Sequence, residues 1–332
     1  MRILILSDGR PGHVNLAEGI AAALGRRQQV EINRLNVDRG RWPGPVAALM
    51  TRSSFSPEQV LKIVYGISVS SLPSADFIIS AGGETLAANI CAAQLLNTPN
   101  IFYGSLRQYR ASDFTLVLTS YPRQTKQAQN IVQTLKPSVL DPDVLPVSPR
   151  SGVLGMLIGG ASGGIAFSRA DWSKLAETIE NTYASYGISW IVSNSRRTPQ
   201  FGSELLRSIA VRSNGPIAEL IDVDGPSASS LSELFANVRG VICTADSSSM
   251  ISEAIWARKP VIAVEPAKFT LTANELDYRN WLARNGWMTS LPISSLAAEK
   301  LPELLNTLTP TTRNPLDDLA GLLSEKLPHL GN

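Results

Sequence analysis

The stretch from Gly240 to Pro266 constrains the fold most, because it passes from buried strand to helix and back to buried strand. An apolar run, Val241 to Cys243, gives way to small polar residues at Thr244 to Ser249. Four apolar residues then recur at helical spacing: Met250, Ile251, Ala254 and Ile255. A second apolar run follows at Val261 to Val264. The pattern predicts strand, turn, helix and strand, the unit from which parallel α/β sheets are built.

The turn inside this stretch holds the residue types that cap a helix: Asp246, Ser247, Ser248 and Ser249. The free N–H groups of a first helical turn, with the positive end of the helix dipole, also form a phosphate site. If the helix begins near Ser248, Glu253 lies about 9 Å along the axis from Ser247, roughly the reach from a diphosphate to a ribose. A ribose can donate two hydroxyl hydrogens to one carboxylate. The alternative is an ordinary capped helix with Glu253 in solvent.

Length and composition bound the class of protein. At 332 residues the chain is about twice the usual domain size, which predicts two domains. A total of 30 Lys and Arg against 28 Asp and Glu leaves a net charge of +2 without a basic block, so charge does not indicate nucleic-acid binding. The cysteines, Cys91 and Cys243, and the histidines, His13 and His329, lack the spacing of a metal site. We therefore expect no metal and no cofactor.

Nothing in the sequence indicates export or membrane insertion. The N-terminal segment MRILILSDG has a short apolar run, too short for a signal peptide. No stretch reaches the roughly 18 consecutive apolar residues that a membrane span requires. We expect a cytoplasmic protein.

The first half opens with a buried-strand run, Ile3 to Leu6, and a loop, Ser7 to His13, before helical spacing begins at Leu16. In a parallel sheet this loop lies at the carboxyl edge, where open α/β sheets bind ligands. Its glycines do not complete a dinucleotide fingerprint, and the chain has no P-loop motif. His13, beside Asp8, is a candidate for proton exchange near neutral pH. The alternative is that His13 only caps a turn.

Strand, glycine loop and helix repeat along the rest of the first half, which is the doubly wound pattern. The predicted strands are Val30 to Leu35, Phe77 to Ile79, Ile101 to Tyr103 and Phe114 to Leu118, and the predicted helices are Leu86 to Leu96 and about Thr125 to Leu135. Glu84 follows the glycines that end the third strand. Earlier, Trp42 lies between Arg41 and Pro43 and near Arg39, a mixture suited either to an anionic membrane surface or to packing on the sheet.

A linker and a second unit follow. Four prolines with little periodicity mark the linker: Pro137, Pro142, Pro146 and Pro149. Beyond it, a strand at Val153 to Ile158 ends in a glycine-rich loop made of Gly159, Gly160, Ala161 and Ser162. Its N–H groups can approach a phosphate closely or form an unliganded turn. Another strand leads to Arg196 and Arg197, which suit a diphosphate or remain in solvent.

The remaining elements complete the domain prediction. Further expected elements are a strand at Leu220 to Val223, helices at Leu231 to Val238 and Thr272 to Asn285, an edge strand at Met288 to Leu291, and a helix at Ser294 to Leu308 broken at Pro302. We expect one domain over residues 1–148 and another over residues 149–310. A last helix within residues 311–332 has no strand after it and is expected to pack back on the first domain.

Three motifs carry a resemblance to a known family: SDGRPGH at Ser7 to His13 followed by Asn15, SRRTP at Ser195 to Pro199, and TADSSSMISEA at Thr244 to Ala254. The chain resembles the family that groups plant mitochondrial-fission "elongated mitochondria" proteins with bacterial proteins assigned as glycosyltransferases. The likeness covers most of the length in the same order. It implies an α/β fold of the GT-B type, with two Rossmann-like doubly wound parallel-sheet domains facing a cleft. The second domain would hold a nucleotide-sugar donor and the first an acceptor.

The resemblance also implies roles for individual residues. Ser247 to Ser249 and the loop from Gly159 to Ser162 would bind the diphosphate, and Glu253 the ribose. The loop facing the acceptor would contain His13 and its neighbours Gly9, Arg10, Gly12 and Asn15. Two departures leave the substrate open: Gly83 and Glu84 stand where relatives usually carry an arginine pair, and Asp224 to Ser229 replaces an expected Asn-Pro-Tyr.

Together these patterns predict transfer of a sugar from a nucleoside diphosphate sugar to an acceptor hydroxyl of a lipid-linked or surface glycan. His13 is the first candidate for the base, followed by Asp8 and Glu84. Without a metal, the helix-start amides, the glycine loop and Arg196 or Arg197 would stabilise the departing diphosphate. One alternative is a non-catalytic adaptor of GT-B shape, peripheral to the inner membrane near Arg39, Arg41 and Trp42. The other is a nucleotide-sugar 2-epimerase.

Overall fold

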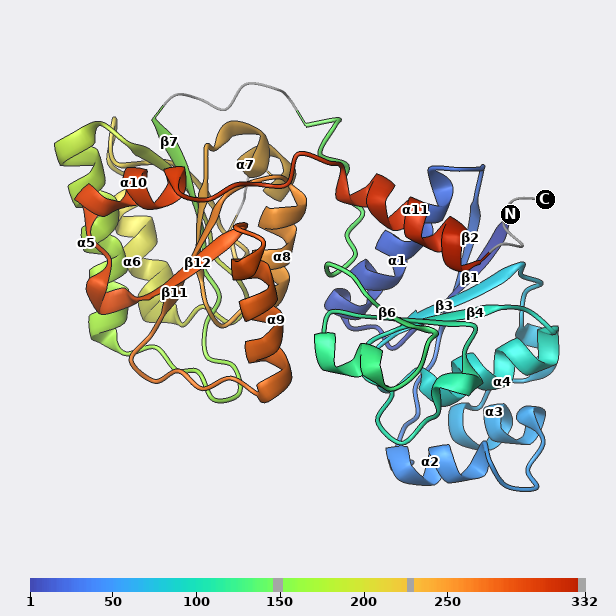
Figure 1. Ribbon diagram of the computed structural model, residues 1–332. Coiled ribbons are helices and arrows are strands. Elements are labelled where there is room, and N and C mark those ends of the chain that lie inside the picture. Colours follow the sequence, from blue (N-terminus) through green and yellow to red (C-terminus); the bar gives the residue numbers. More distant parts are fainter. Residues whose placement is uncertain (146–151, 226–229, 328–332) are drawn as a thin grey trace. The chain divides into compact units, whose positions relative to one another are not determined.

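A computed structural model describes residues 1–145, 152–225 and 230–327 (Figure 1). The chain forms two compact units. The first consists of Met1–Val139 and the segment that begins at Pro315, and the second of Leu140–Asn314. The boundary expected at residues 148 and 149 falls outside the described residues, as do Pro146, His329 and most of the segment that replaces the Asn-Pro-Tyr motif.

Six parallel strands form the sheet of the first unit, in the order β2-β1-β3-β4-β5-β6. They are β1 (Arg2–Ser7), β2 (Glu31–Asn36), β3 (Phe77–Ala81), β4 (Asn100–Tyr103), β5 (Leu116–Thr119) and β6 (Ile131–Gln133). In β1, Leu4 and Leu6 belong to the core under the helices of one face, and Ile3 and Ile5, which alternate with them, are also fully buried. Burial on both faces explains the unbroken apolar run.

Helices cover both faces of this sheet (Figure 1). They are α1 (Pro11–Gly25), α2 (Gly44–Met50), α3 (Pro57–Tyr65), α4 (Leu86–Leu96) and α11 (Pro315–Lys326). Local signals fix α3: Ser56 and Gln59 form a capping box at its start, and Gly66 ends it in the left-handed conformation. On the opposite face α11 packs against α1, and Arg26 Nε lies 2.7 Å from an Asp317 oxygen.

The sheet of the second unit also has six parallel strands, in the order β12-β11-β10-β7-β8-β9. They are β7 (Val153–Leu157), β8 (Ser189–Ser193), β9 (Ile217–Ile221), β10 (Val241–Thr244), β11 (Val261–Glu265) and β12 (Met288–Pro292). The helices are α5 (Arg169–Tyr186), α6 (Gln200–Ala210), α7 (Leu231–Asn237), α8 (Ser248–Trp256), α9 (Ala273–Arg284) and α10 (Leu301–Asn306). Figure 1 shows α5 and α6 on one face and α8 and α9 on the other. The prediction of two doubly wound α/β domains is confirmed, and β12 is an edge strand as expected.

One helix prediction is wrong. Residues Thr125 to Leu135 form the end of a short 3-10 helix, Pro122–Lys126, and the strand β6. Ile131 and Val132 pair in parallel with β5, so the apolar residues of this segment extend the sheet and do not cover it. The helix predicted for Ser294 to Leu308 is confirmed only at its end. Two 3-10 turns, Ile293–Ser295 and Ala298–Lys300, precede α10 (Leu301–Asn306), and Pro302 lies in the first turn of α10, where no intrahelical N–H is needed.

In each sheet there is one pair of neighbouring strands from which the chain continues toward opposite edges of the sheet. In the first sheet this switch lies between β1 and β3, and in the second between β10 and β7. Loops at the carboxyl ends of the two strands diverge there, which leaves room for a ligand. The loop after β1 contains Asp8 and leads into the first turn of α1, which contains His13, and the loops after β7 and β10 contain Gly159 and Asp246.

Two glycines of the first unit, one in α1 and one in α11, differ in how closely other atoms pack around them. A Cβ on Gly19 of α1 would lie 2.5 Å from the Ser138 nitrogen, whereas one on Gly321 of α11 would meet nothing within 4 Å. We expect Gly19→Ala to lower the free energy of unfolding by about 1–3 kcal/mol, because backbone atoms must move. Gly321→Ala should raise it by about 0.5–1 kcal/mol through reduced chain entropy. Scanning calorimetry measures both, and a stabilised Gly19→Ala protein would contradict the packing.

Candidate functional site

The carboxylate of Asp246 joins three loops at the switch of the second sheet. Its side chain is 0% exposed, and its Oδ2 accepts from the Gly160 N–H at 3.0 Å and from Arg197 Nη1 at 2.7 Å. Its Oδ1 is buried without a hydrogen-bond partner. The loops after β7, β8 and β10, expected separately from the sequence, are therefore brought together by one side chain.

Two of the predicted glycines are required by close contacts. A Cβ on Gly159 would lie 2.1 Å from Asp246 Oδ2, and one on Gly160 would lie 1.8 Å from the Arg197 carbonyl oxygen. The loop then closes in a tight turn, because Ser162 and Ile165 exchange backbone hydrogen bonds around Gly163, which has a φ of 56°. The glycine-rich segment is thus a preformed turn, with Ala161 and Ser162 at its exposed surface.

Some backbone N–H groups at this edge of the sheet already have an acceptor within the protein, and others do not. Gly159 N–H donates to Thr244 Oγ1 at 2.7 Å, and Gly160 N–H to Asp246, so both amides are used inside the protein. Ser247 caps α8 by accepting from Met250 N–H. Within the described part of the chain, the N–H groups of Ser248 and Ser249 have no acceptor, as is usual in a first helical turn. The donors open to a ligand therefore come from α8 more than from the glycine loop.

Arg279 is a residue that the sequence did not indicate. It is 5% exposed, and its Nη2 donates to the Ala245 carbonyl at 2.7 Å and to Ser248 Oγ at 3.1 Å. Its Nε donates to Glu275 at 3.2 Å, while Nη1 is buried without a partner. Arg279 therefore holds the Ala245 carbonyl and the Ser248 hydroxyl, and it places a buried positive charge at the start of α8. The sequence around α8 does not predict its role, because Arg279 lies on α9, far from Ser248 along the chain.

Glu253 lies one turn after the exposed Ser249 on the same side of α8. Burial raises the pKa of its carboxyl from 4.5 to about 7. No hydrogen bond or ion pair to the Glu253 carboxylate is found among the residues that the structure describes. A half-buried carboxyl without a partner can accept hydroxyl hydrogens from a ligand when it is ionised.

The two predicted arginines differ in their surroundings. Arg197 is held by Asp246, although 39% of its side chain remains exposed. Arg196 is exposed and is not brought to Asp246. Only Arg197 therefore belongs to the assembled cluster.

At the switch of the first sheet, Asp8 and His13 form a dyad. His13 Nδ1 lies 2.7 Å from Asp8 Oδ2, and the Asp8 side chain is 3% exposed whereas that of His13 is 30% exposed. If the proton lies on Nδ1, the hydrogen bond to Asp8 leaves Nε2 as an acceptor, the tautomer that a general base needs. The imidazole lies against the backbone of Gly82, where a Cβ would come 2.2 Å from Nδ1.

The expected acceptor loop surrounds this dyad. Gly9 has a φ of 73°, a conformation that favours glycine, and its N–H donates to Ser7 Oγ. Arg10 N–H donates to Asp8 Oδ1 at 3.2 Å. Gly12 and Asn15 are exposed on the first turns of α1. The structure thus gathers these residues in the loop after β1 and the first turns of α1, and among the described residues Asn15 has no hydrogen bond to the dyad.

Glu84 has a different environment from the dyad. Its carboxylate lies 3.1 Å from Arg39 Nη2, and its carbonyl accepts from the Tyr65 hydroxyl. The Arg39 side chain is only 13% exposed. The Arg39 guanidinium therefore pairs with Glu84, and the proposed membrane contact near Arg39, Arg41 and Trp42 stays a prediction.

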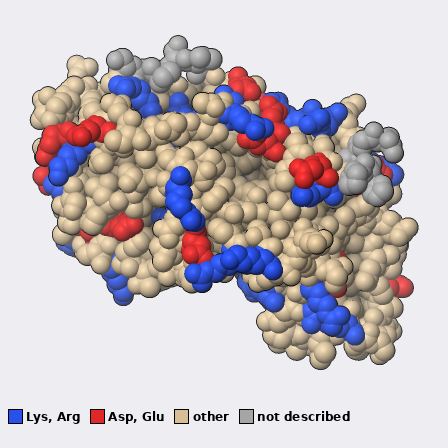
Figure 2. Space-filling view, in the orientation of Figure 1, with Lys and Arg blue, Asp and Glu red and all other residues tan. Residues whose placement is uncertain are grey.

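The surface of α2 and α3 is apolar with a basic rim, and we call it the α2–α3 surface. Its exposed apolar side chains are Trp42, Val46, Leu49, Phe55 and Ile63. Its exposed basic residues are Arg41, Arg52 and Lys62. Figure 2 shows this end of the first unit as largely uncharged, with Lys or Arg and little Asp or Glu.

The described residues contain neither a candidate metal cluster nor a membrane-spanning helix. No three His, Cys, Asp or Glu side chains in residues 1–145, 152–225 and 230–327 come together so as to hold a metal ion. None of the helices described is both long and apolar enough to span a bilayer.

The sequence profile described as mitochondrial fission ELM1 matches residues 11–320. The chain belongs to this family. A comparison with curated protein sequences gives no match.

Solved structures similar to this family member share its fold. MurG of Acinetobacter baumannii is 17% identical, with a TM-score of 0.51 over 98% of this chain and 94% of that one. The UDP-GlcNAc 2-epimerase of Neisseria meningitidis, solved with UDP-GlcNAc, is 11% identical, with a TM-score of 0.57 over 99% and 100%. The corresponding epimerase of Methanocaldococcus jannaschii is 13% identical, with a TM-score of 0.56 over 99% and 100%. The fold is therefore the glycosyltransferase-like GT-B fold, and at these identities the likeness extends to the fold alone.

Arg107 lies close to Gly83, where the family resemblance leads us to expect an arginine. A Cβ on Gly83 would lie 2.5 Å from the Arg107 guanidinium carbon. Arg107 comes from the loop after β4 and has a φ of 53°, unusual for a residue with a side chain. A guanidinium thus reaches the loop after β3 from elsewhere in the chain.

The raised pKa of Glu253 predicts a pH-dependent stability. The folded state holds the proton more tightly than the unfolded state, so the free energy of unfolding should fall as the pH rises from about 4.5 to about 7. We expect a loss on the order of 2–3 kcal/mol, absent in Glu253→Gln. Five of the six tryptophans lie in the second unit, so urea titrations followed by tryptophan fluorescence report on it. Exposed Glu299, as Glu299→Gln, is the matched control, and an equal slope in Glu253→Gln would contradict the assignment.

Proposed function

We propose that the protein is a glycosyltransferase that moves a sugar from a nucleoside diphosphate sugar to an acceptor hydroxyl. The observation that carries the proposal is the start of α8 at the switch of the second sheet. Free N–H groups of Ser248 and Ser249, the buried cation of Arg279 and the partly buried carboxyl of Glu253 lie along one helix start. This order of donors followed by an acceptor suits a diphosphate followed by a ribose.

The same groups would stabilise the leaving diphosphate. Charge develops on the diphosphate oxygens as the sugar departs, and fixed N–H donors in a partly water-excluded site stabilise it without reorganisation. Arg279 and Arg197 add positive charge, although Asp246 offsets part of that of Arg197. On this proposal the reaction needs no metal and no cofactor.

The Asp8–His13 dyad is the proposed base. Its Nε2 would accept the hydroxyl proton of the acceptor while Asp8 stabilises the imidazolium that forms. Asp8 therefore acts through His13. Glu84 is the weaker candidate, because Arg39 already holds its carboxylate. The acceptor would lie against the loop of Gly9, Arg10 and Gly12.

The α2–α3 surface supports a second proposal, that the protein binds an anionic membrane surface from the cytoplasm. Apolar side chains would enter the headgroup region while Arg41, Arg52 and Lys62 meet anionic lipids. A lipid-linked acceptor glycan would be presented at such a surface. A non-catalytic adaptor at the inner membrane would use the same contact.

Nucleotide titration tests the first proposal. By calorimetry with UDP, GDP, ADP and CMP, we expect at least one to bind, and more tightly as the pH rises through about 7, since the ribose hydroxyls require ionised Glu253. Glu253→Ala should weaken binding about tenfold or more, because hydrogen bonds to a charged group are lost. His13→Ala should leave nucleotide affinity unchanged but slow sugar release from the donor.

The outcomes of this test separate the rival functions. Failure of all four nucleotides to bind would remove the transferase proposal. Conversion of the donor sugar to its 2-epimer without an acceptor would replace transfer by epimerisation. Nucleotide affinity lost in His13→Ala but kept in Glu253→Ala would reverse the assigned roles.

Vesicle binding tests the membrane proposal. We expect sedimentation with phosphatidylglycerol vesicles that weakens with salt, and about tenfold weaker binding for Leu49→Asp, since burying a leucine is worth about 1.5–3 kcal/mol. Leu49 is 67% exposed, so its replacement should not unfold the protein. Val211→Asp, at a site in the second unit that is 79% exposed, is the matched control. Equal losses in both variants would rule out the α2–α3 surface as the contact.

A further inference from the structure

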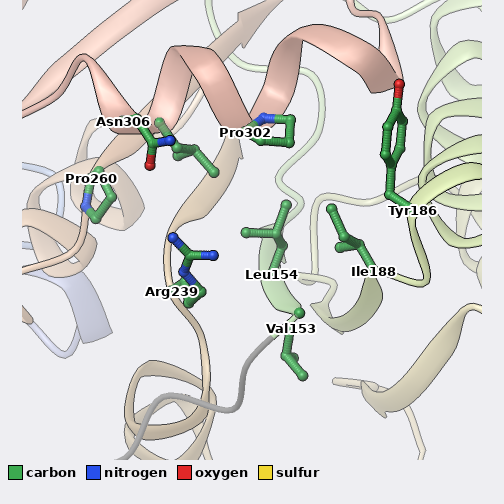
Figure 3. A pocket seen from close by; sticks show the side chains of 10 residues that line it. Val153, Leu154, Tyr186, Ile188, Arg239, Pro260, Pro302 and Asn306 are labelled. Atoms are coloured by element: carbon green, nitrogen blue, oxygen red, sulfur yellow. The ribbon is translucent and has the colours of Figure 1, made fainter.

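A cavity of about 290 Å³ lies in the second unit at the amino ends of its strands (Figure 3). Its floor is formed where β7 begins, by Arg239, two residues before β10, and by Pro260, the residue before β11. Helix α10 and the end of α5 contribute the other walls. Because β7 rises about 3.3 Å per residue, the cavity is about 16 Å from the carboxyl edge that carries Gly159 and Asp246. It is therefore a separate place from the candidate nucleotide site.

Most of the cavity wall is apolar. The apolar lining residues are Val153, Leu154, Ile188, Pro260, Pro302 and Leu305. Prolines and residues at strand starts are held by the backbone, so these walls are rigid. A cavity of about 150 Å³ can take up benzene, so this one has room for about two fused rings.

One cation, the exposed residue Arg239, lies at the edge of this apolar space. Figure 3 shows the guanidinium of Arg239 directed inward between Pro260 and Leu154, toward Asn306. Within the part of the chain that the structure describes, the Arg239 side chain has no hydrogen bond or ion pair. The neighbouring cation, Lys259, donates to the Val238 carbonyl at 3.0 Å. None of the ten lining residues is acidic.

The charge at the cavity favours an anion. Helix α5 ends at Tyr186 on the rim, and its negative end amounts to roughly half a charge, less than the full charge of Arg239. A phosphate would need several donors to replace its hydration, and the cavity offers one guanidinium and the Asn306 amide. A single carboxylate matches the fork of one guanidinium.

We propose that this cavity is a second ligand site, which binds a small carboxylate with an aromatic or branched apolar body. The carboxylate pairs with Arg239 and accepts from the Asn306 amide, and the apolar body lies against Leu154, Ile188 and Pro302. The site does not depend on the proposed transferase activity, because none of its residues belongs to the cluster around Asp246.

The test uses 2-naphthoate as the probe, with the full chain and calorimetric or fluorescence titration. We expect saturable binding with a dissociation constant on the order of 1 mM, as expected of a ligand of this size. Arg239→Met should weaken binding about tenfold, and Arg239→Lys should retain most of it. 2-Naphthylmethanol, which lacks the charge, should bind equally to the wild type and to Arg239→Met.

Two further variants locate the probe. Asn306 is exposed, so Asn306→Trp should fill the mouth of the cavity and abolish binding of both compounds without unfolding the chain. Arg212→Met, an exposed arginine of the same unit that pairs with Glu180, is the matched control and should bind normally. Absence of saturable binding, displacement of the probe by UDP, or an equal loss in Arg212→Met would each overturn the proposal.

Discussion

The buried carboxylate of Asp246 is the contact on which the candidate site of the second unit depends. A carboxylate that is removed from water must be compensated, and here Arg197 and the Gly160 N–H supply the compensation. The pairing fixes the loops after β7 and β8 against the start of α8. It also explains why glycine is needed twice, because Asp246 and the Arg197 backbone occupy the space of two Cβ atoms. The cluster is therefore built before any ligand binds.

Much of the fold could be predicted because the strands of a parallel sheet are buried on both faces. Such burial leaves unbroken apolar runs, and β1, β3, β10 and β11 were each evident from theirs. The segment around Thr125 to Leu135 failed because a short strand at a sheet edge, Ile131–Gln133, has too few residues to establish a period. The membership of α11 in the first unit rests on contacts with α1, which no local pattern records.

In the candidate site, too, residues that lie close together in the sequence could be predicted, and residues that come from distant elements could not. Asp8 and His13 lie close together in the sequence at the start of α1, and Ser247 to Ser249 at the start of α8, so the sequence alone could group each set. Arg279 and Arg107 reach their loops from other elements, and their roles follow only from the folded chain. The N–H groups of Gly159 and Gly160 are a subtler case. Their sequence favours phosphate binding, but side chains from β10 and its loop already accept both hydrogens.

The two units offer complementary chemistry. In the second, the groups at the switch are hydrogen-bond donors and cations, and the one unpartnered carboxyl, Glu253, has its pKa raised by burial to about 7. Such a site can stabilise departing negative charge but has no basic group poised by a partner. In the first, the Asp8–His13 dyad can accept a proton, and Arg107, an exposed cation, comes from a different loop, the one after β4. The proposed sugar transfer requires both a stabilised leaving group and a base. In this chain the groups suited to these two roles belong to different units.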